Sequence, residues 1–446
     1  MRASLAFAFA VAVVLLIPSI ASSGSELDDG VLTFNEAWTL TRQHSPQRAA
    51  AQAQVDAARF RLQAAAGALL PSVTVQSSYA RLSELDPTAF EIPGLGSLQM
   101  GEAIPNMYTN SVEVSQPLFT GFALTQARRA AACSLDAAQQ DARLVEMDLE
   151  IALEQAYFGE VAAAGMLGAV MQGIATITAH RELVLKLEEV GLATHLDVTQ
   201  ADTRLAALEV AKVEVESARN LARLATHFLT GIPLGTVFAI QETVDSRPTP
   251  ELNPGVLLQE AYAARPELLA LAHMVDAADA MARIEAAALL PSVGAQFRYQ
   301  YDRPNQRIYP MVDEYDGTWD VSIGLRWTVF DGFAALRRSQ AARREHQALA
   351  RQLDHVRDLI ALDVAQRAVE VQAANGRVVA STAALRAAEE YLRVAKERYE
   401  VGDTTNTDVL DAQTAETEAR VKLIQAQIDL RLASVRLMKS LGRDPE

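Results

Sequence analysis

Apolar and polar side chains alternate strictly along two segments in the second half of the chain. Residues 293–301 place Val, Ala, Phe, Tyr and Tyr at every second position, and residues 319–327 do the same with Trp, Val, Ile, Leu and Trp. Residues 73–79 and 112–114 repeat the pattern more weakly in the first half. A period of two that leaves one apolar and one polar face predicts four β-strands.

These strands fit a membrane-spanning sheet better than the alternative, the half-buried strands of a soluble sandwich. Trp319 and Trp327 lie near strand ends, as in the aromatic girdle of a membrane barrel. Strands of about ten residues also match a tilted bilayer crossing. Four strands cannot stand alone in lipid, because their open edges would leave backbone groups without hydrogen-bond partners. Closed barrels need at least about eight strands, so several chains must contribute, and three chains would supply about twelve strands around an aqueous lumen.

Two segments of 69 residues each, 122–190 and 333–401, contain no proline and are rich in strong helix formers. Such a helix is roughly 100 Å long, too long for the core of a compact globule, so it must lie against parallel neighbours in a coiled coil. After a Val-Gly turn, a return helix of about 38 residues ends at Gly231 or Gly442.

Two shorter helices are predicted beside each long one. The opening segments, residues 46–69 and 266–289, have about 24 residues each. An opening helix stacked end to end on a return helix would nearly match one long helix. Residues 231–265, rich in proline and glycine, would then connect the two halves at mid-height.

The chain is a tandem repeat. Residues 46–73 agree with residues 266–293 at 13 of 28 positions, and Leu-Phe-Thr-Gly-Phe at 118–122 returns as Val-Phe-Asp-Gly-Phe at 329–333. The offset between the copies changes only between these two landmarks, so one loop differs by nine residues between the halves. Each half has the order helix, strand, loop, strand, long helix, turn and return helix.

The first residues form an export signal rather than part of the fold. Arg2 precedes an uninterrupted apolar run at residues 5–17, and small residues follow at Ser19 and Ala21. The run is too short to span a bilayer, and no later segment has about 18 consecutive apolar residues, so no membrane-spanning helix is predicted. The predicted segments are a signal peptide (1–21), repeat 1 (22–230) and repeat 2 (231–446).

Composition narrows the chemistry. With 40 basic and 56 acidic side chains the net charge is −16, which argues against a nucleic-acid partner because no basic excess is left to neutralise phosphates. The single cysteine, Cys133, excludes an intrachain disulfide and a cysteine-based zinc site. The histidines show no His-x-x-x-His spacing, and there is neither a Gly-rich phosphate loop nor a Gly-x-Ser-x-Gly elbow. We expect no enzyme activity, no cofactor and no metal site.

The doubled Leu-Leu-Pro-Ser-Val, the Phe-x-Gly-Phe junctions at 119–122 and 330–333, and the Val-Gly turns at 190–191 and 401–402 together resemble the TolC family of outer-membrane efflux proteins. The resemblance implies a mostly α-helical homotrimer in the cell outer membrane. Four strands from each chain would form a twelve-stranded β-barrel that continues into an α-helical coiled-coil barrel across the periplasm. Implied partners are a periplasmic adaptor protein and an inner-membrane transporter of the RND or ABC type.

The resemblance also assigns roles at the tips, which are the turns between the long and the return helices. The turn residues implied to dock the adaptor are Val190, Gly191, Leu192, Val401 and Gly402.

Asp408 and Asp411 match the aspartates that form the channel constriction in family members. In a trimer they would make two three-fold carboxylate rings, so we expect the resting channel to be narrowest there and selective for cations. In the alternative interpretation Asp197 and Asp408 are helix N-caps, with Gln200 and Asp411 as their capping-box partners.

A latch is implied beside this constriction. Family members close the tip with a tyrosine and an arginine; Tyr399 matches the tyrosine, whereas Thr404 stands at the position of the arginine. Asp197 completes the predicted latch. We expect a tip less tightly closed than in members that keep the arginine.

Three functions follow from these patterns. The leading one is the exit duct of a tripartite efflux pump that carries small molecules, such as drugs, out of the cell. The alternatives are the exit duct of a type I protein secretion system and, less in keeping with the strands, a periplasmic coiled-coil scaffold without a pore. In either duct, the loops at 83–106 and 303–315 are expected to face outside the cell.

Overall fold

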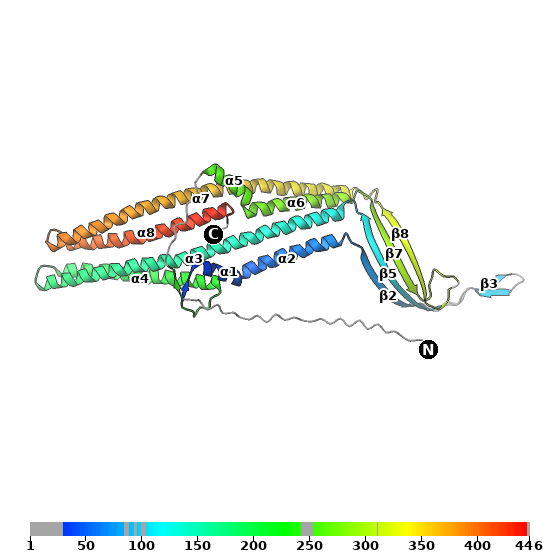
Figure 1. Ribbon diagram of the computed structural model, residues 1–446, viewed down its shortest axis with the longest axis horizontal. Helices are drawn as coiled ribbons and strands as arrows, with labels where there is room; N and C mark the ends of the chain where they lie inside the picture. The colour runs from blue at the N-terminus through cyan, green and yellow to red at the C-terminus, as the bar shows by residue number, and fades with distance from the viewer. Residues whose placement is uncertain are drawn as a thin grey trace.

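The structure is a computed structural model that describes residues 30–83, 89–92, 96–99, 104–241, 253–309 and 311–443. The predicted signal peptide at residues 1–21 lies outside the described residues. The described chain is an elongated body of helices with a β-sheet at one end (Figure 1).

Two helices of 67 residues run the length of this body, as the proline-free segments predicted. The six helices of the body are α2 (Pro46–Gly67), α3 (Ala123–Glu189), α4 (His195–Thr230), α6 (Pro266–Ala287), α7 (Ala334–Glu400) and α8 (Asn406–Ser440). Helices α4 and α2 follow one another along α3, and α8 and α6 follow one another along α7 (Figure 1). The predicted stacking of two shorter helices beside each long one is therefore confirmed.

Each long helix starts at a Gly-Phe pair in the left-handed backbone region. Gly121 and Phe122 have φ of 61° and 71°, and the equivalent Gly332 and Phe333 have φ of 69° and 65°. Gly121 allows no side chain, because a Cβ there would lie 2.7 Å from the carbonyl oxygen of Ala287. The Phe-x-Gly-Phe motif is thus the joint at which a strand passes directly into a helix.

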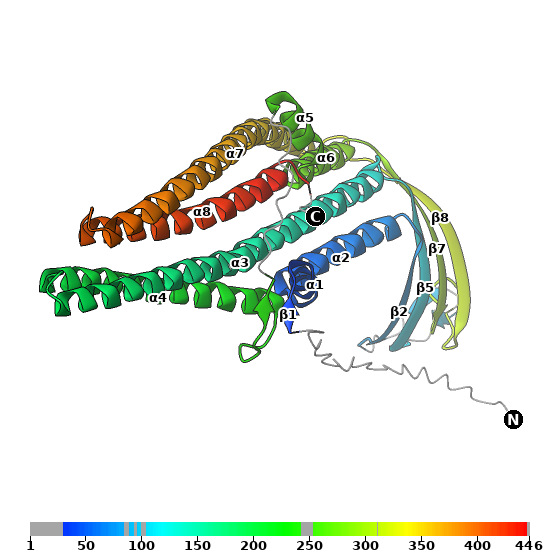
Figure 2. The same cartoon turned by 60° about the vertical axis from the view of Figure 1, so that its left-hand side comes forward.

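The four predicted strands form one antiparallel sheet in the order β2-β5-β7-β8 (Figure 2). Their bounds are β2 (Ser72–Arg81), β5 (Asn106–Phe119), β7 (Ser292–Asp302) and β8 (Asp316–Arg326). Strands β2 and β8 are the two edges, and each has a free row of backbone groups.

The two faces of this sheet differ as the alternation predicted. Val75, Trp319 and Ile323 expose 66–74% of their surface on the apolar face. On the opposite face, Glu113 of β5 and Arg298 of β7 are paired in register and joined by an ion pair of 2.8 Å. The sheet is curved (Figure 2). Ser115, Gln296 and Ser322, which share the face of Glu113 and Arg298, line a hollow on the sheet, so the polar face is its concave side.

Several short elements were not predicted. They are β1 (Val31–Leu32), α1 (Phe34–His44), the hairpin β3 (Ala89–Ile92) and β4 (Gly96–Gln99), β6 (Ala239–Ile240) and α5 (Pro254–Ala264). Strands β1 and β6 pair in parallel beside α1, and the Tyr157 hydroxyl of α3 donates to the Leu32 carbonyl oxygen at 2.9 Å. The hairpin lies beyond the sheet, at the end of the molecule (Figure 1), whereas the other elements surround the middle of the body, where a connection between the halves was expected.

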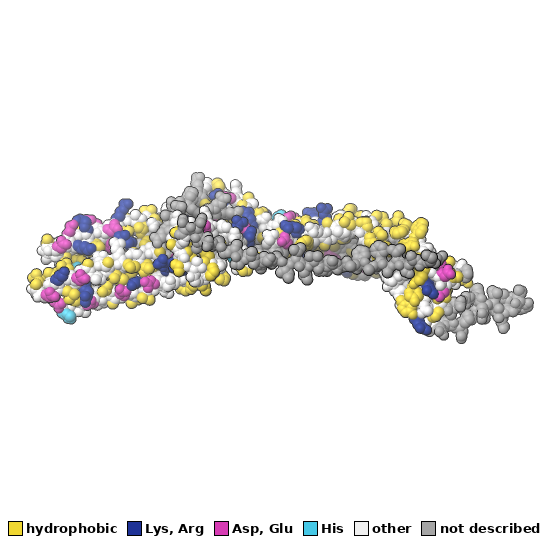
Figure 3. All heavy atoms as spheres, turned by 60° about the horizontal axis from the view of Figure 1, so that its bottom comes forward, with side chains coloured by type: hydrophobic (Ala, Val, Ile, Leu, Met, Phe, Trp, Pro, Cys, Tyr) yellow, Lys and Arg dark blue, Asp and Glu magenta, His cyan; other side chains and the backbone are white. Residues whose placement is uncertain are grey.

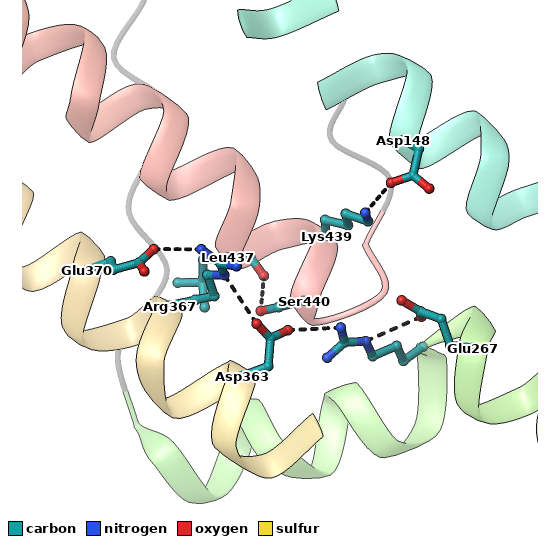
Figure 4. Close-up of polar contacts among 9 residues, drawn as sticks. Asp148, Glu267, Asp363, Arg367, Glu370, Leu437, Lys439 and Ser440 are labelled. Carbon is teal, nitrogen blue, oxygen red and sulfur yellow. Dashed lines mark hydrogen bonds and ion pairs between the residues drawn. The ribbon is translucent and has the colours of Figure 1, made fainter. Parts of the chain in front are cut away.

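A polar cluster fastens the end of α8 at mid-height (Figure 4). The Arg265 guanidinium contacts Asp363 at 2.9 Å and Glu267 at 3.3 Å, and Lys439 pairs with Asp148 of α3. Next to it, Gly442 lies so close to α5 that a Cβ would be 2.5 Å from the carbonyl carbon of Ala264. The end of the return helix α8 and the mid-height helix α5 therefore meet so closely that position 442 has no room for a side chain.

Helix α3 is the one described helix that is long and apolar enough, by composition, to cross a membrane. The sequence pattern predicted none, because polar residues interrupt every apolar run in this segment. In the fold, α3 packs against α2, α4, α6 and α8 and so is the central helix of the body. Acidic and basic side chains crowd the tip half of the face shown in Figure 3, whereas hydrophobic side chains predominate next to the sheet.

Candidate functional site

The end of the helical body farthest from the sheet consists of two turns of nearly identical shape. Val190 and Val401 end the long helices with the same φ and ψ of −96° and 3°, and Gly191 and Gly402 follow with φ of 79° and 75°. Glycine suits both positions because a left-handed backbone strains other residues. Val190, Leu192 and Val401 are 68–78% exposed, so the tip presents apolar side chains to its surroundings.

The capping interpretation of the aspartates was wrong by three residues. The N-caps of α4 and α8 are Thr194 and Thr405, whose hydroxyls accept from the backbone N–H groups of Asp197 and Asp408. Each aspartate is instead the third residue of the helix and accepts from the backbone N–H of its threonine, which completes a capping box. Gln200 is therefore not a capping-box partner.

The carboxylate of Asp408 is held by the residues just before it. Its Oδ2 accepts from the hydroxyls of Thr405 and Thr404, both at 2.7 Å, and from the Thr405 backbone N–H at 3.0 Å. These bonds, those of Thr405 first, lower the pKa of Asp408 to about 2. Asp408 is thus anionic at neutral pH, and Thr404 contacts it directly.

Asp411 is one helical turn further along α8 and has a different partner. Its Oδ1 accepts from Arg204 of α4 at 2.7 Å, and both side chains are about half exposed. The two predicted constriction residues therefore differ within one chain: Asp408 is held by hydroxyls and a backbone N–H, whereas Asp411 has an arginine partner.

Of the predicted latch, Tyr399 lies against α3 rather than against Thr404. Its ring packs edge-on against the His180 ring, with 5.2 Å between centroids. Burial raises the pKa of Tyr399, and the negative charge of Asp197 raises it further. The charge of Asp197 thus acts on the Tyr399 hydroxyl, whereas the hydroxyl of Thr404 donates to Asp408.

A buried asparagine that the sequence did not single out joins the two helical hairpins. Asn406, only 5% exposed, accepts through its Oδ1 from His180 Nε2 at 2.8 Å. Its Nδ2 donates to the Asp197 carbonyl oxygen at 3.0 Å and to Gln200 Oε1 at 3.1 Å. One side chain at the start of α8 therefore holds both α3 and α4.

A groove of about 450 Å³ runs beside this contact, between α3, α7 and α8. The polar side chains of its lining are Gln172, Thr176, His180, Lys396, Tyr399, Glu400 and Gln413. Gln413 is 2% exposed, and its amide has no hydrogen-bond partner among the residues that the structure describes. Over the same described part of the chain, no group of three or more His, Cys, Asp or Glu residues is placed to hold a metal ion.

Comparison with known proteins places this architecture in a family. The family described as outer membrane efflux protein matches residues 38–231 and 257–443. The chain is 24% identical over 341 residues to the outer membrane efflux protein BepC of Brucella suis, covering 75% of this chain and 72% of BepC. It is 22% identical to the outer membrane protein TolC of Vibrio cholerae, over 91% of this chain and 90% of that protein.

Solved structures show the same fold. The CusC channel superposes with a TM-score of 0.78 at 18% identity, over 92% of both chains. The outer membrane protein VceC of Vibrio cholerae superposes with a TM-score of 0.76 at 20% identity, over 93% of this chain and 97% of that one. The TolC-like fold, with its helical body and tandem repeat, is confirmed, and the chain belongs to the outer membrane efflux protein family.

Proposed function

We propose that three copies of this chain form the outer-membrane exit duct of a tripartite efflux pump. The chain itself would act as a passive channel. An inner-membrane transporter would supply the energy for transport, and a periplasmic adaptor would join that transporter to the duct. Relatives such as the toluene efflux pump outer membrane protein TtgC of Pseudomonas putida support efflux over the secretion alternative.

The observation that carries this proposal is a curved sheet that is incomplete in one chain. Strands β2 and β8 have unpaired edges, and the apolar face of the sheet is exposed. In lipid the apolar face would be favourable, but the open edges would be costly until β8 of one chain pairs with β2 of the next. A head-to-tail contact of this kind closes into a ring.

The helices support the same arrangement, since the two edge helices carry exposed apolar stripes, on α4 between the tip and mid-height and on α7 around mid-height. The stripe on α4 consists of Val210, Val213, Leu221, Leu224 and Phe228, and all five are exposed. Leu359, Leu362 and Val369 form an exposed stripe on α7, at the opposite edge. Contact between α4 of one chain and α7 of the next would remove from water the part of the stripes where they overlap, near Phe228 and Val369.

At the tips, the proposal gives each turn a role. Around a three-fold axis, three copies of Asp408 and Asp411 would converge at the end of the helical barrel and narrow it. The exposed apolar turns at Val190 and Val401 would receive the adaptor, and the groove beside Tyr399 offers a concave surface next to them.

The trimer is tested by the mass of the purified protein in detergent, measured by light scattering, and by single-channel recording in lipid bilayers. We expect three chains per particle and discrete conductance steps. Phe228→Asp should dissociate the trimer, because a charge replaces the most exposed residue of the α4 stripe, whereas Phe228→Leu should preserve it. A monodisperse monomer that needs no detergent would contradict the proposal.

A further inference from the structure

The loop between β7 and β8 folds back over the polar face of the sheet instead of extending away from it. The segment concerned is residues 304–308, called the strap below. Asn305, its second residue, is 3% exposed, although it lies in a connection between two strands at the far end of the molecule.

Side-chain contacts define which face the strap covers. The Asn305 Nδ2 donates to the Asp316 carbonyl oxygen at 2.9 Å and to Thr318 Oγ1 at 3.3 Å, and Arg307 Nη1 donates to Asp320 Oδ1 at 2.9 Å. Thr318 and Asp320 alternate with Trp319, so they point to the polar face of β8.

The strap also reaches β5. Gln306 Nε2 lies 3.9 Å from the sulfur of Met107, which is on the same face of β5 as Glu113 because the two positions are six residues apart. The strap therefore crosses the concave side of the sheet from β8 to β5, over the end of β7. On the other face, Arg303 and Asp313 anchor the base of the loop with an ion pair of 2.8 Å.

The concave polar face is the wall of the lumen if the proposed trimer forms, and the present inference rests on that proposed function. We propose that the three straps narrow the outer mouth of the barrel and set an upper size limit for the solutes that leave through it, with Asn305 and Arg307 as the residues that hold each strap in the lumen.

Charge compensation along the wall shows why the limit is one of size. Asp320 of β8 is neutralised by Arg307, and in the same row of paired residues Glu113 of β5 is neutralised by Arg298 of β7. At these two places an acidic side chain of the wall is thus compensated by an arginine. A mouth narrowed by the straps excludes cargo as wide as the barrel.

The test uses a reporter cysteine deeper in the lumen, in the full-length protein on intact cells. Cys133→Ser removes the native thiol, and Ser322→Cys places one on the polar face of β8, below the strap. Externally added maleimides, one small and others with polyethylene-glycol chains of increasing mass, then report the size of the opening. The strap variant is Asn305→Ala with Arg307→Ala, and Arg326→Ala is the control that removes an equal charge from the far end of β8.

We expect the small maleimide to label the reporter in every variant and large ones to label it only in the strap variant. Their labelling rate should rise by about tenfold or more, which corresponds to a shift of about 1.4 kcal/mol in the equilibrium between closed and open straps. The Arg326→Ala control should keep the size limit. Arg307→Ala alone should raise the limit partially, so the result does not depend on one variant that folds poorly.

Equal labelling by large reagents with and without the strap contacts would overturn the inference while leaving the channel intact. If large reagents failed to label the reporter cysteine both with and without the strap contacts, the inference would also be overturned, because something other than the strap would then limit the opening. If even the small maleimide failed to reach the cysteine, the lumen would not open to the outside, and the proposed function itself would fail.

Discussion

Asn406 is the side chain whose loss should most affect the tip, and Asn406→Ala is the perturbation that shows it. Its amide makes three hydrogen bonds, at 2.8, 3.0 and 3.1 Å, to α3 and α4. At roughly 0.5–1.5 kcal/mol for each net bond, their loss costs about 2–4 kcal/mol, and it leaves His180 buried without its partner. The whole fold should survive, because the helices remain packed along their length.

The cost should appear as local opening of the tip. A change of about 2–4 kcal/mol raises the population of the open tip by roughly 30- to 1,000-fold, which hydrogen exchange of the backbone amides around Val190 and Val401 would measure. The matched control is His195→Ala, since His195 occupies the position of Asn406 in the first repeat and its side chain is 86% exposed. Equal exchange in the two variants would refute the role of Asn406.

The same contact makes the tip sensitive to acid. Burial lowers the pKa of His180 below its ordinary value of 6.5, with Lys396 acting in the same direction and the bond to Asn406 opposing it. An open tip that exposes His180 binds a proton more readily than the closed tip, so closure should weaken as the pH falls below 6.5. Tyr399 and Lys396 face His180 from α7. The measurement is the exchange rate relative to the intrinsic rate of an unprotected amide at the same pH. If this ratio did not change with pH, the expectation would be removed, and His180→Gln should abolish its pH dependence.

Three further outcomes are expected. Asp408→Asn with Asp411→Asn should remove cation selectivity and block by multivalent cations in bilayer recordings, whereas unchanged recordings would leave only the capping role of Asp408. Thr404→Arg should lower single-channel conductance, because an arginine at that position would pair with Asp408 instead of donating one hydroxyl. Gly442→Ala should lower the melting temperature by several degrees, since its Cβ would lie 2.5 Å from Ala264, and an unchanged melting curve would show that the α8 terminus moves freely.

Regular elements of this fold could be predicted because their signals are local and repeated. Long helices begin after Gly-Phe and end at Val-Gly in both halves, so each predicted boundary lies within about one residue of the observed one. Short mid-height elements such as α1 and α5 were missed, since eleven residues carry too little periodicity to separate a helix from a loop.

The candidate site was predictable only in part. Tip glycines and aspartates stand out because both repeats carry them, yet the caps were assigned to Asp197 and Asp408 when a threonine three residues earlier performs that role. His180 and Asn406 are 226 residues apart in the sequence, and no local sequence pattern indicates that two such distant residues are in contact. A difference between the repeats was the available signal, because the first repeat has His195 where the second has Asn406.

The Gly-Phe joints between the sheet and the helices are the points about which each long helix would tilt, so a small tilt there moves the distant tip by a large distance. A helix of 67 residues extends about 100 Å, so a tilt of about 5° at its base displaces its far end by roughly 9 Å. Each base holds two consecutive left-handed residues, and the ring of Phe122 packs edge-on against Phe119 at 5.3 Å, as Phe333 does against Phe330 at 5.4 Å. Small substitutions at these Gly-Phe joints should therefore change the width of the opening at the tip more than many substitutions at the tip itself.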